Sequence, residues 1–238
     1  MTNVKTMQAF EKLLGVCTGY GGKYNPGRPN LRIESMSNQL EEVRQAMEQV
    51  KAARTAYDNQ INRRKQRFHQ LPRLVSSVMR TLEASGASAE KLEDARQYAR
   101  MIRGKPSTSR PPVPSEAAQE VKAKRSILQL AYVSMADSFS KLVQAVSSEP
   151  LYQPLEPEWK PDGLLAQWQE LTQLNSSVEL ARTQWQASCI ARNFVMYKKP
   201  MSMYETARAV KKYVRAVYGL DSEQYAQVKS IDFVNLKR

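Results

Sequence analysis

Four basic side chains cluster in "NRRKQRFHQLPR", residues 62–73, and could bind phosphate: Arg63, Arg64, Lys65 and Arg67. Guanidinium and ammonium groups attract nucleic-acid phosphates and release counterions. A formal net charge of +13 at pH 7 fits such a partner. The excess charge is nevertheless spread thinly, and a charge run on a helix is usually a solvated face. We therefore consider nucleic acid a possible partner but do not favour it.

Other side chains with catalytic or metal-binding chemistry are few. His69 is the only histidine, which excludes a multi-histidine metal site, and no Ser/His/Asp set has a persuasive context. Cys17 and Cys189 are too few for a disulfide framework or a thiolate zinc site. We expect a non-enzymatic protein without metal or cofactor, in a reducing, cytoplasmic setting.

Apolar periodicity indicates which elements carry these residues. In the first half of the chain, steps of three, four or seven residues join Met36, Leu40, Val43, Met47, Val50, Tyr57, Ile61, Phe68 and Leu71. This heptad-like seam predicts a long helix packed against partner helices, with its end or a kink at Pro72. A second seam runs through Leu164, Trp168, Leu171, Val178, Trp185, Cys189 and Met196.

The two seams share one register. A shift of 128 residues places Leu40 on Trp168 and Phe68 on Met196. Arginine interrupts both seams at the same two places, at Arg54 and Arg64 in the first and at Arg182 and Arg192 in the second. We expect these four arginines either to form a buried polar seam that fixes helix register or to extend outward with only their stems packed. Glu120 and Asp137 are candidate acceptors for the buried arrangement.

The register continues into the segments that follow the long helices. Each contains a helix, a turn glycine (Gly86 or Gly219) and a serine that can cap the next helix (Ser88 or Ser222). The sequence therefore predicts an all-α, long-helix bundle built from two related helix-plus-hairpin halves joined by a central long helix.

This pattern divides the chain into six segments that we expect to pack as one compact domain. They are an irregular N-terminal arm at 1–31, a first helical repeat at 32–104, a Pro-rich linker at 105–114, a central long helix at 115–147, a Pro-rich acidic connection at 148–162 and a second helical repeat at 163–238. Residues 20–30, "YGGKYNPGRPN", are the reason for expecting an irregular arm. Tyr20 and Tyr24 are candidate anchors for contact with another subunit, the alternative being packing on the same chain.

Four stretches resemble a group of uncharacterised, all-helical bacterial proteins of the Bacteroidetes type. They are "YGGKYNP" (20–26), "EPLYQP" (149–154), "IARN" (190–193) and "VKKYVRAVYGLDSEQYAQV" (210–228). The resemblance implies a folded helical protein of bacterial origin and carries over no functional residue.

Long seams and an arm that packs are features of assembly. The expected function is a non-enzymatic helical scaffold or self-assembling interaction protein, as a homo-oligomer or with another protein. The alternatives are a basic nucleic-acid-binding protein, a membrane-active helical protein and an unrecognised enzyme. No stretch approaches the roughly 20 apolar residues that span a bilayer.

Overall fold

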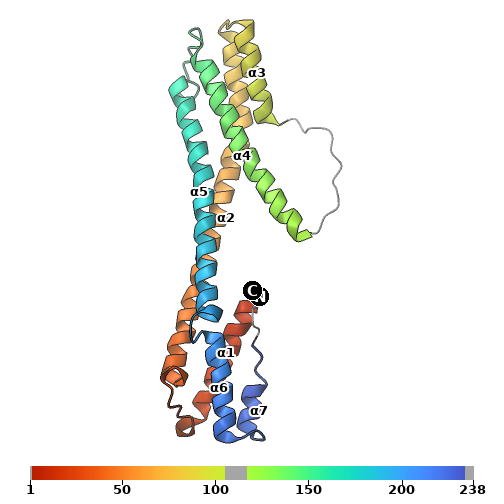
Figure 1. Ribbon diagram of the computed structural model, residues 1–238. Coiled ribbons are helices and arrows are strands. Elements are labelled where there is room, and N and C mark those ends of the chain that lie inside the picture. Colours follow the sequence, from red (N-terminus) through yellow and green to blue (C-terminus); the bar gives the residue numbers. More distant parts are fainter. Residues whose placement is uncertain (1, 105–116, 234–238) are drawn as a thin grey trace. The chain divides into compact units, whose positions relative to one another are not determined.

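The computed structural model describes residues 2–104 and 117–233, and this part of the chain is all-α, with no strand (Figure 1). Its α-helices are α1 (Thr2–Gly19), α2 (Ile33–Ala84), α3 (Ala89–Arg103), α4 (Ala117–Ser147), α5 (Pro161–Asn193), α6 (Met203–Tyr218) and α7 (Glu223–Lys229). Short helical turns occur at Gly21–Lys23 (η1), Pro29–Leu31 (η2) and Phe194–Lys198 (η3, a π-helix). Within the described residues, no helix has the length and apolar content needed to cross a membrane.

The chain divides into two compact units, which differs from the single compact domain expected from the sequence. Unit 1 comprises Met1–Ala56 and Arg182–Arg238, and unit 2 comprises Tyr57–Ala181. Each unit contains its own cluster of buried apolar side chains. Both long helices, α2 and α5, begin in one unit and end in the other.

The prediction of an irregular arm at 1–31 is wrong for most of its length, because α1 occupies Thr2–Gly19. Phe10, Leu13 and Cys17 follow helical spacing, and all three are completely buried in the core of unit 1. Only the stretch between α1 and α2, which holds three glycines and two prolines, is irregular apart from η1 and η2. The glycine-rich composition that predicts irregular structure is confined to residues 20–30 and does not apply to the residues before them.

Helix α2 does not end at Pro72, which lies inside it. An interior proline removes one backbone hydrogen bond and costs about 3 kcal/mol. The apolar series continues beyond it through Val75, Val78 and Leu82, all buried in the core of unit 2. This burial offsets the cost, since an apolar side chain of this size contributes about 1.5–3 kcal/mol when buried.

The expected central helix at 115–147 corresponds to α4, whose C-terminal part carries the buried residues Phe139, Leu142 and Val146. The connection at 148–162 is a series of turns before α5 begins at Pro161. The expected linker at 105–114 lies outside the residues that the structure describes. The side chain of Glu120, the candidate acceptor near the start of α4, is also outside the described part.

Candidate anion-binding groove

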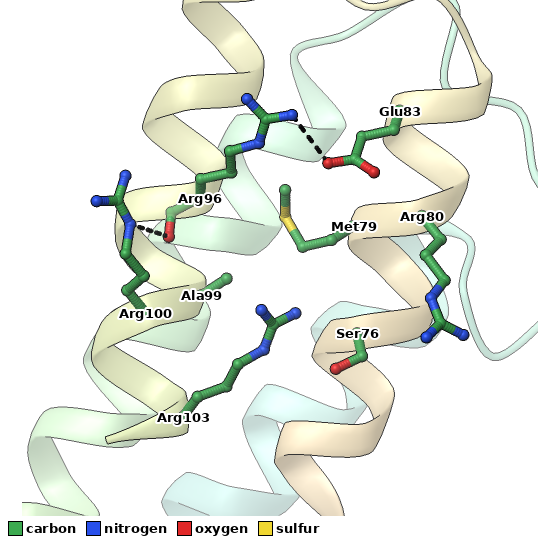
Figure 2. Close-up of a pocket in the computed structure, with 8 residues that line it drawn as sticks. All are labelled: Ser76, Met79, Arg80, Glu83, Arg96, Ala99, Arg100 and Arg103. Carbon is green, nitrogen blue, oxygen red and sulfur yellow. Dashed lines mark hydrogen bonds and ion pairs between the residues drawn. The ribbon is translucent and has the colours of Figure 1, made fainter. Parts of the chain in front are cut away.

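An open groove of about 600 Å³ lies in unit 2 between the last part of α2 and α3 (Figure 2). Its floor includes Met79 and Ala99, which are buried. Its walls are strongly basic, and the lining comprises Ser76, Met79, Arg80, Glu83, Arg96, Ala99, Arg100 and Arg103. The lining therefore includes four arginines and a single glutamate.

Local sequence explains why three of these arginines share one face of α3. Arg96, Arg100 and Arg103 are spaced by four and three residues, which places them on one side of a helix. Ser88 is the N-cap of this helix, and its side chain accepts a hydrogen bond from the backbone N–H of Lys91. The turn before it contains Gly86 at φ +76°, a conformation that favours glycine. The turn and cap thus bring this basic face alongside α2.

Two of the four arginines are engaged by carboxylates. Arg96 Nη2 lies 3.0 Å from Glu83 Oε1 across the groove, and Arg100 pairs with Glu93 on its own helix. Arg100 Nε also donates to the backbone oxygen of Arg96 at 3.3 Å, as Figure 2 shows. Both ion pairs are solvent-exposed, so each contributes at most about 1 kcal/mol and is readily exchanged for another anion.

Arg80 and Arg103 have no hydrogen-bond or ion-pair partner among the described residues. Figure 2 shows the Arg103 side chain reaching from α3 toward α2 above Ser76, whereas Arg80 extends along α2. Free guanidinium donors in a groove are suited to phosphate or carboxylate oxygens, which they bind in a bidentate manner. The groove can therefore hold an anion, and such binding would weaken with salt.

The groove was not predicted from the sequence, whose basic run instead indicated phosphate contacts at Arg63, Arg64, Lys65 and Arg67. The missed signal was the spacing of the arginines on α3 rather than their density along the chain. The predicted phosphate contacts do not form one accessible surface. Arg63 and Lys65 are exposed, but Arg67 is engaged by Glu170 Oε2 at 2.7 Å and by Gln167 Oε1 at 2.9 Å.

Arg64 is wrong as a phosphate contact because only 5% of it is exposed. Its guanidinium carbon lies 4.4 Å from the ring centroid of Tyr132, a cation–π contact. Its Nε and Nη1 are buried without a hydrogen-bond partner, and burial lowers its pKa. The nearby Tyr132, Tyr57 and Glu179 oppose that shift.

The four seam arginines differ in their surroundings. Arg54 lies 4.4 Å from the Trp185 ring centroid, and Arg192 donates to Asn193 Oδ1 at 2.9 and 3.1 Å. Arg182 is exposed and Arg64 is buried, so the four do not form one uniformly buried lock. The candidate acceptor Asp137 pairs instead with Lys141 at 2.8 Å.

Tyr20 and Tyr24 both bond within their own chain. Tyr24 is buried and donates to the backbone oxygen of Leu31 at 2.8 Å. Tyr20 donates to the backbone oxygen of Gln224 at 2.8 Å and contacts the ring of Tyr218. These contacts correspond to the intramolecular alternative for the arm, and the intersubunit contact stays a prediction.

Among the side chains that the structure describes, in 3–104 and 131–233, no group of three or more His, Cys, Asp or Glu residues is arranged to hold a metal ion. His69 is exposed. Burial raises the pKa of the Cys17 thiol to about 12, which keeps this thiol protonated and poorly nucleophilic at neutral pH.

Comparison of the chain with known protein families, curated proteins and solved structures found no match. The resemblance to Bacteroidetes-type helical proteins stays a prediction.

Proposed function

We propose that the protein is a non-enzymatic helical scaffold built from two related halves and that it acts through protein–protein assembly. Half 1 comprises residues 2–104, with α1, α2 and α3, and half 2 comprises residues 117–233, with α4, α5, α6 and α7. This division extends the duplication predicted from the long helices to α1 and α4. The observation that carries it is a tyrosine hydrogen bond that occurs in both halves.

Tyr24 and Tyr152 are 128 residues apart, the same shift that relates the two long-helix seams. Each is buried, and each donates its hydroxyl at 2.8 Å to the backbone oxygen of the residue seven positions later, Leu31 or Trp159. Both bonds close the irregular stretch that leads into a long helix. Two unrelated loops have no reason to share this contact at this spacing.

The helices that precede these loops have matching buried residues. A shift of 129 residues places Phe10 on Phe139, Leu13 on Leu142 and Cys17 on Val146, and all six are completely buried. The change from 129 to 128 corresponds to one additional residue in the first loop. In this arrangement α4 is the counterpart of α1 rather than an unrelated central helix.

The segments after the long helices match as well. Gly86 and Gly219 both have positive φ, at +76° and +92°. The side chains of Ser88 and Ser222 each accept from the backbone N–H three residues later. Repeated caps and turns support a common origin for the two hairpins.

A scaffold role fits the structural function of the two buried tyrosine hydroxyls, whose pKa values are raised. Burial raises the pKa of Tyr152 to about 12 and raises that of Tyr24 as well. Both phenols therefore remain protonated and serve as hydrogen-bond donors within the fold. Native mass measured over a range of concentrations, with and without nuclease, tests the proposal. We expect a protein-only species heavier than the 27.1 kDa chain, and a monomer at every concentration would contradict self-assembly.

A second candidate function, binding of a polyanion, is favoured by one observation: Arg80 and Arg103 face solvent at the groove without carboxylate partners among the described residues. The probe is a fluorescent single-stranded DNA oligonucleotide, followed by anisotropy over a range of salt concentrations. We expect weak binding that lacks sequence preference.

The double variant Arg80→Gln/Arg103→Gln should lower the salt slope of log K by about 0.7 for each phosphate that the groove no longer neutralises. The matched control is Arg208→Gln/Arg215→Gln, which removes two exposed arginines from α6 in unit 1. Equal effects in the two double variants would show that binding reflects overall charge rather than the groove.

A further inference from the structure

Each compact unit takes its helices from both halves of the chain. Unit 1 contains α1 and the start of α2 from half 1, together with the end of α5, α6 and α7 from half 2. Unit 2 contains the remainder of α2 and α3 from half 1, together with α4 and the start of α5 from half 2. Neither half forms a unit by itself.

The buried clusters have the same mixed composition. In unit 2, Phe68 and Leu71 of half 1 pack in one cluster with Phe139 and Leu142 of half 2. The rings of Phe68 and Tyr132 meet at a centroid distance of 4.8 Å. In the cluster of unit 1, half 1 supplies residues such as Phe10, Leu13 and Met36, and half 2 supplies Met203, Val210 and Val214. Separating the halves would expose both clusters.

Polar contacts also join the halves inside each unit. In unit 1, Gln39 donates to the backbone oxygen of Met201 at 2.7 Å, and Glu42 pairs with Lys199. In unit 2, Arg67 bonds Glu170 and Gln167, and Lys91 donates to Ser148 at 2.6 Å. The surface that each half presents to the other is therefore large, apolar and marked by specific charge pairs.

We infer that the partner that fits this surface is a second copy of the same chain, which can donate its half 2 to half 1 of the first copy and receive the reciprocal half. This inference rests on the two-half organisation proposed above and supplies a mechanism for the proposed self-assembly. The packing and polar contacts between the halves are preserved after such an exchange, because the same residues meet in the same pairs. Exchange of identical elements is a low-cost route to a dimer, favoured by high protein concentration.

Charge reversal at two contacts between the halves can test this exchange in the full-length chain. The first variant changes half 1 only, with Glu42→Lys and Arg67→Glu. The introduced lysine then faces Lys199, and the introduced glutamate faces Glu170. The second variant changes half 2 only, with Lys199→Glu and Glu170→Arg, so that its introduced charges face Glu42 and Arg67. Each variant alone carries like charges in both units, whether or not it exchanges with itself.

Only exchange between the two variants removes all of this repulsion. The changed half 1 then meets the changed half 2 with opposite charges, and the two unchanged halves restore the parent pairs. The variants, one of them isotopically labelled, are mixed in urea, refolded together at high concentration and weighed by native mass spectrometry. We expect the mixed dimer to exceed the two same-variant dimers by about tenfold, since several surface pairs of modest strength change sign together.

A matched control uses a charge pair that lies entirely within half 1. Arg44 Nη2 and Glu11 Oε1 are 2.6 Å apart, and both residues belong to half 1. Exchange of halves between an Arg44→Glu chain and a Glu11→Arg chain relieves no repulsion, so this mixture should form mixed dimers only at the statistical proportion.

The exchange would be overturned if the mixture of the half 1 variant and the half 2 variant formed no more mixed dimer than this control mixture. If the single variants do not fold, the exchange would be overturned when their mixture also does not fold. Failure of exchange is distinct from failure of the scaffold proposal, because the parent protein can be oligomeric by native mass without exchanging halves.

Discussion

The step from long helix to hairpin differs between the two units. In unit 2, α2 continues without interruption past Pro72, so Leu71 follows Phe68 after three residues. The proposed duplication aligns Met196 and Met203 of unit 1 with Phe68 and Leu71. These two methionines are seven residues apart, with η3 and a turn between α5 and α6. The four additional residues approximate one helical turn of 3.6 residues, which keeps both methionines buried. An insertion close to one turn in length preserves the apolar pattern while changing the backbone.

That turn holds Met201 at φ +57°, a conformation that is uncommon for a side chain of this size. Three side chains hold its backbone. Gln39 and Thr206 donate to its oxygen, and Glu205 accepts from its N–H at 2.9 Å. Unit 2 needs no such support, because its helix is continuous. Under the proposed duplication, the two halves have matching buried apolar positions and differ at the polar turn of unit 1.

The largest effect is expected from truncating the matched phenylalanines. Phe10 and Phe139 are completely buried, one in each unit. Replacing either with alanine should cost about 3–5 kcal/mol in the free energy of unfolding, measured by urea denaturation followed by circular dichroism. The control Val133→Ala, at a position 51% exposed, should change stability by less than about 0.5 kcal/mol. A large cost at only one phenylalanine would break the equivalence of the two cores.

The next effect concerns Arg64, which is buried, whereas its counterpart Arg192 is bonded to Asn193. Two Arg64 nitrogens lack partners, so Arg64→Met should leave stability unchanged or raise it by about 1–4 kcal/mol, because a well-packed apolar side chain avoids desolvating the charge. Arg192→Met should change it by less than about 1 kcal/mol. A loss of stability in Arg64→Met, measured by thermal denaturation against an Arg63→Met control, would instead assign a structural role to the buried charge.

Much of the helical core was predictable from periodicity. Of the seam residues, Met36, Leu40, Val43, Phe68 and Leu71 are buried on α2, as are Leu164, Leu171 and Val178 on α5. Helical spacing of apolar residues is a local property, so the sequence indicates it directly. The continuation of α2 past Pro72 was not predictable in this way, since it depends on how much apolar surface the next turns bury against other helices.

The candidate groove and the composition of each unit depend on tertiary contacts. The arginines of α3 share a face that the sequence specifies, but the position of Arg80 opposite that face depends on the turn at Gly86. Arg64 is the opposite case. Its position in a basic run predicts exposure to solvent, but it is buried against Tyr132 of α4. Likewise, no local pattern indicates that Tyr20 bonds Gln224, which is 204 residues away.

A smaller effect is expected from removing the matched tyrosine hydroxyls. Tyr24→Phe and Tyr152→Phe each delete one buried hydrogen bond while keeping the ring, which should cost about 1 kcal/mol. Similar shifts of the urea midpoint in the two variants would sharpen the equivalence of the two loops. The reference for both variants is the parent protein.

The raised tyrosine pKa leads us to expect a loss of stability at alkaline pH. An unperturbed tyrosine has a pKa of about 10, whereas burial raises the pKa of Tyr152 to about 12. The folded state therefore holds this proton more tightly than the unfolded state. The associated stability is complete below about pH 10 and is lost as pH rises through about 12. In Tyr152→Phe the decline in stability above pH 10 should be shallower, as measured by urea denaturation at several pH values. A slope equal to that of the parent would exclude Tyr152 as a contributor.

The smallest effect is expected at the two serine caps, and here the comparison should reveal a difference. Ser88 caps the 15-residue α3, and Ser222 caps the 7-residue α7. Removing either cap should cost about 0.5–1 kcal/mol, since one backbone N–H loses its acceptor. A short helix has few internal hydrogen bonds with which to resist fraying, so Ser222→Ala should increase amide hydrogen exchange throughout α7. Ser88→Ala should affect only the first turn of α3, where Lys91 lies. Exchange that spreads equally far in both helices would show that tertiary packing, rather than the cap, holds α7 in place.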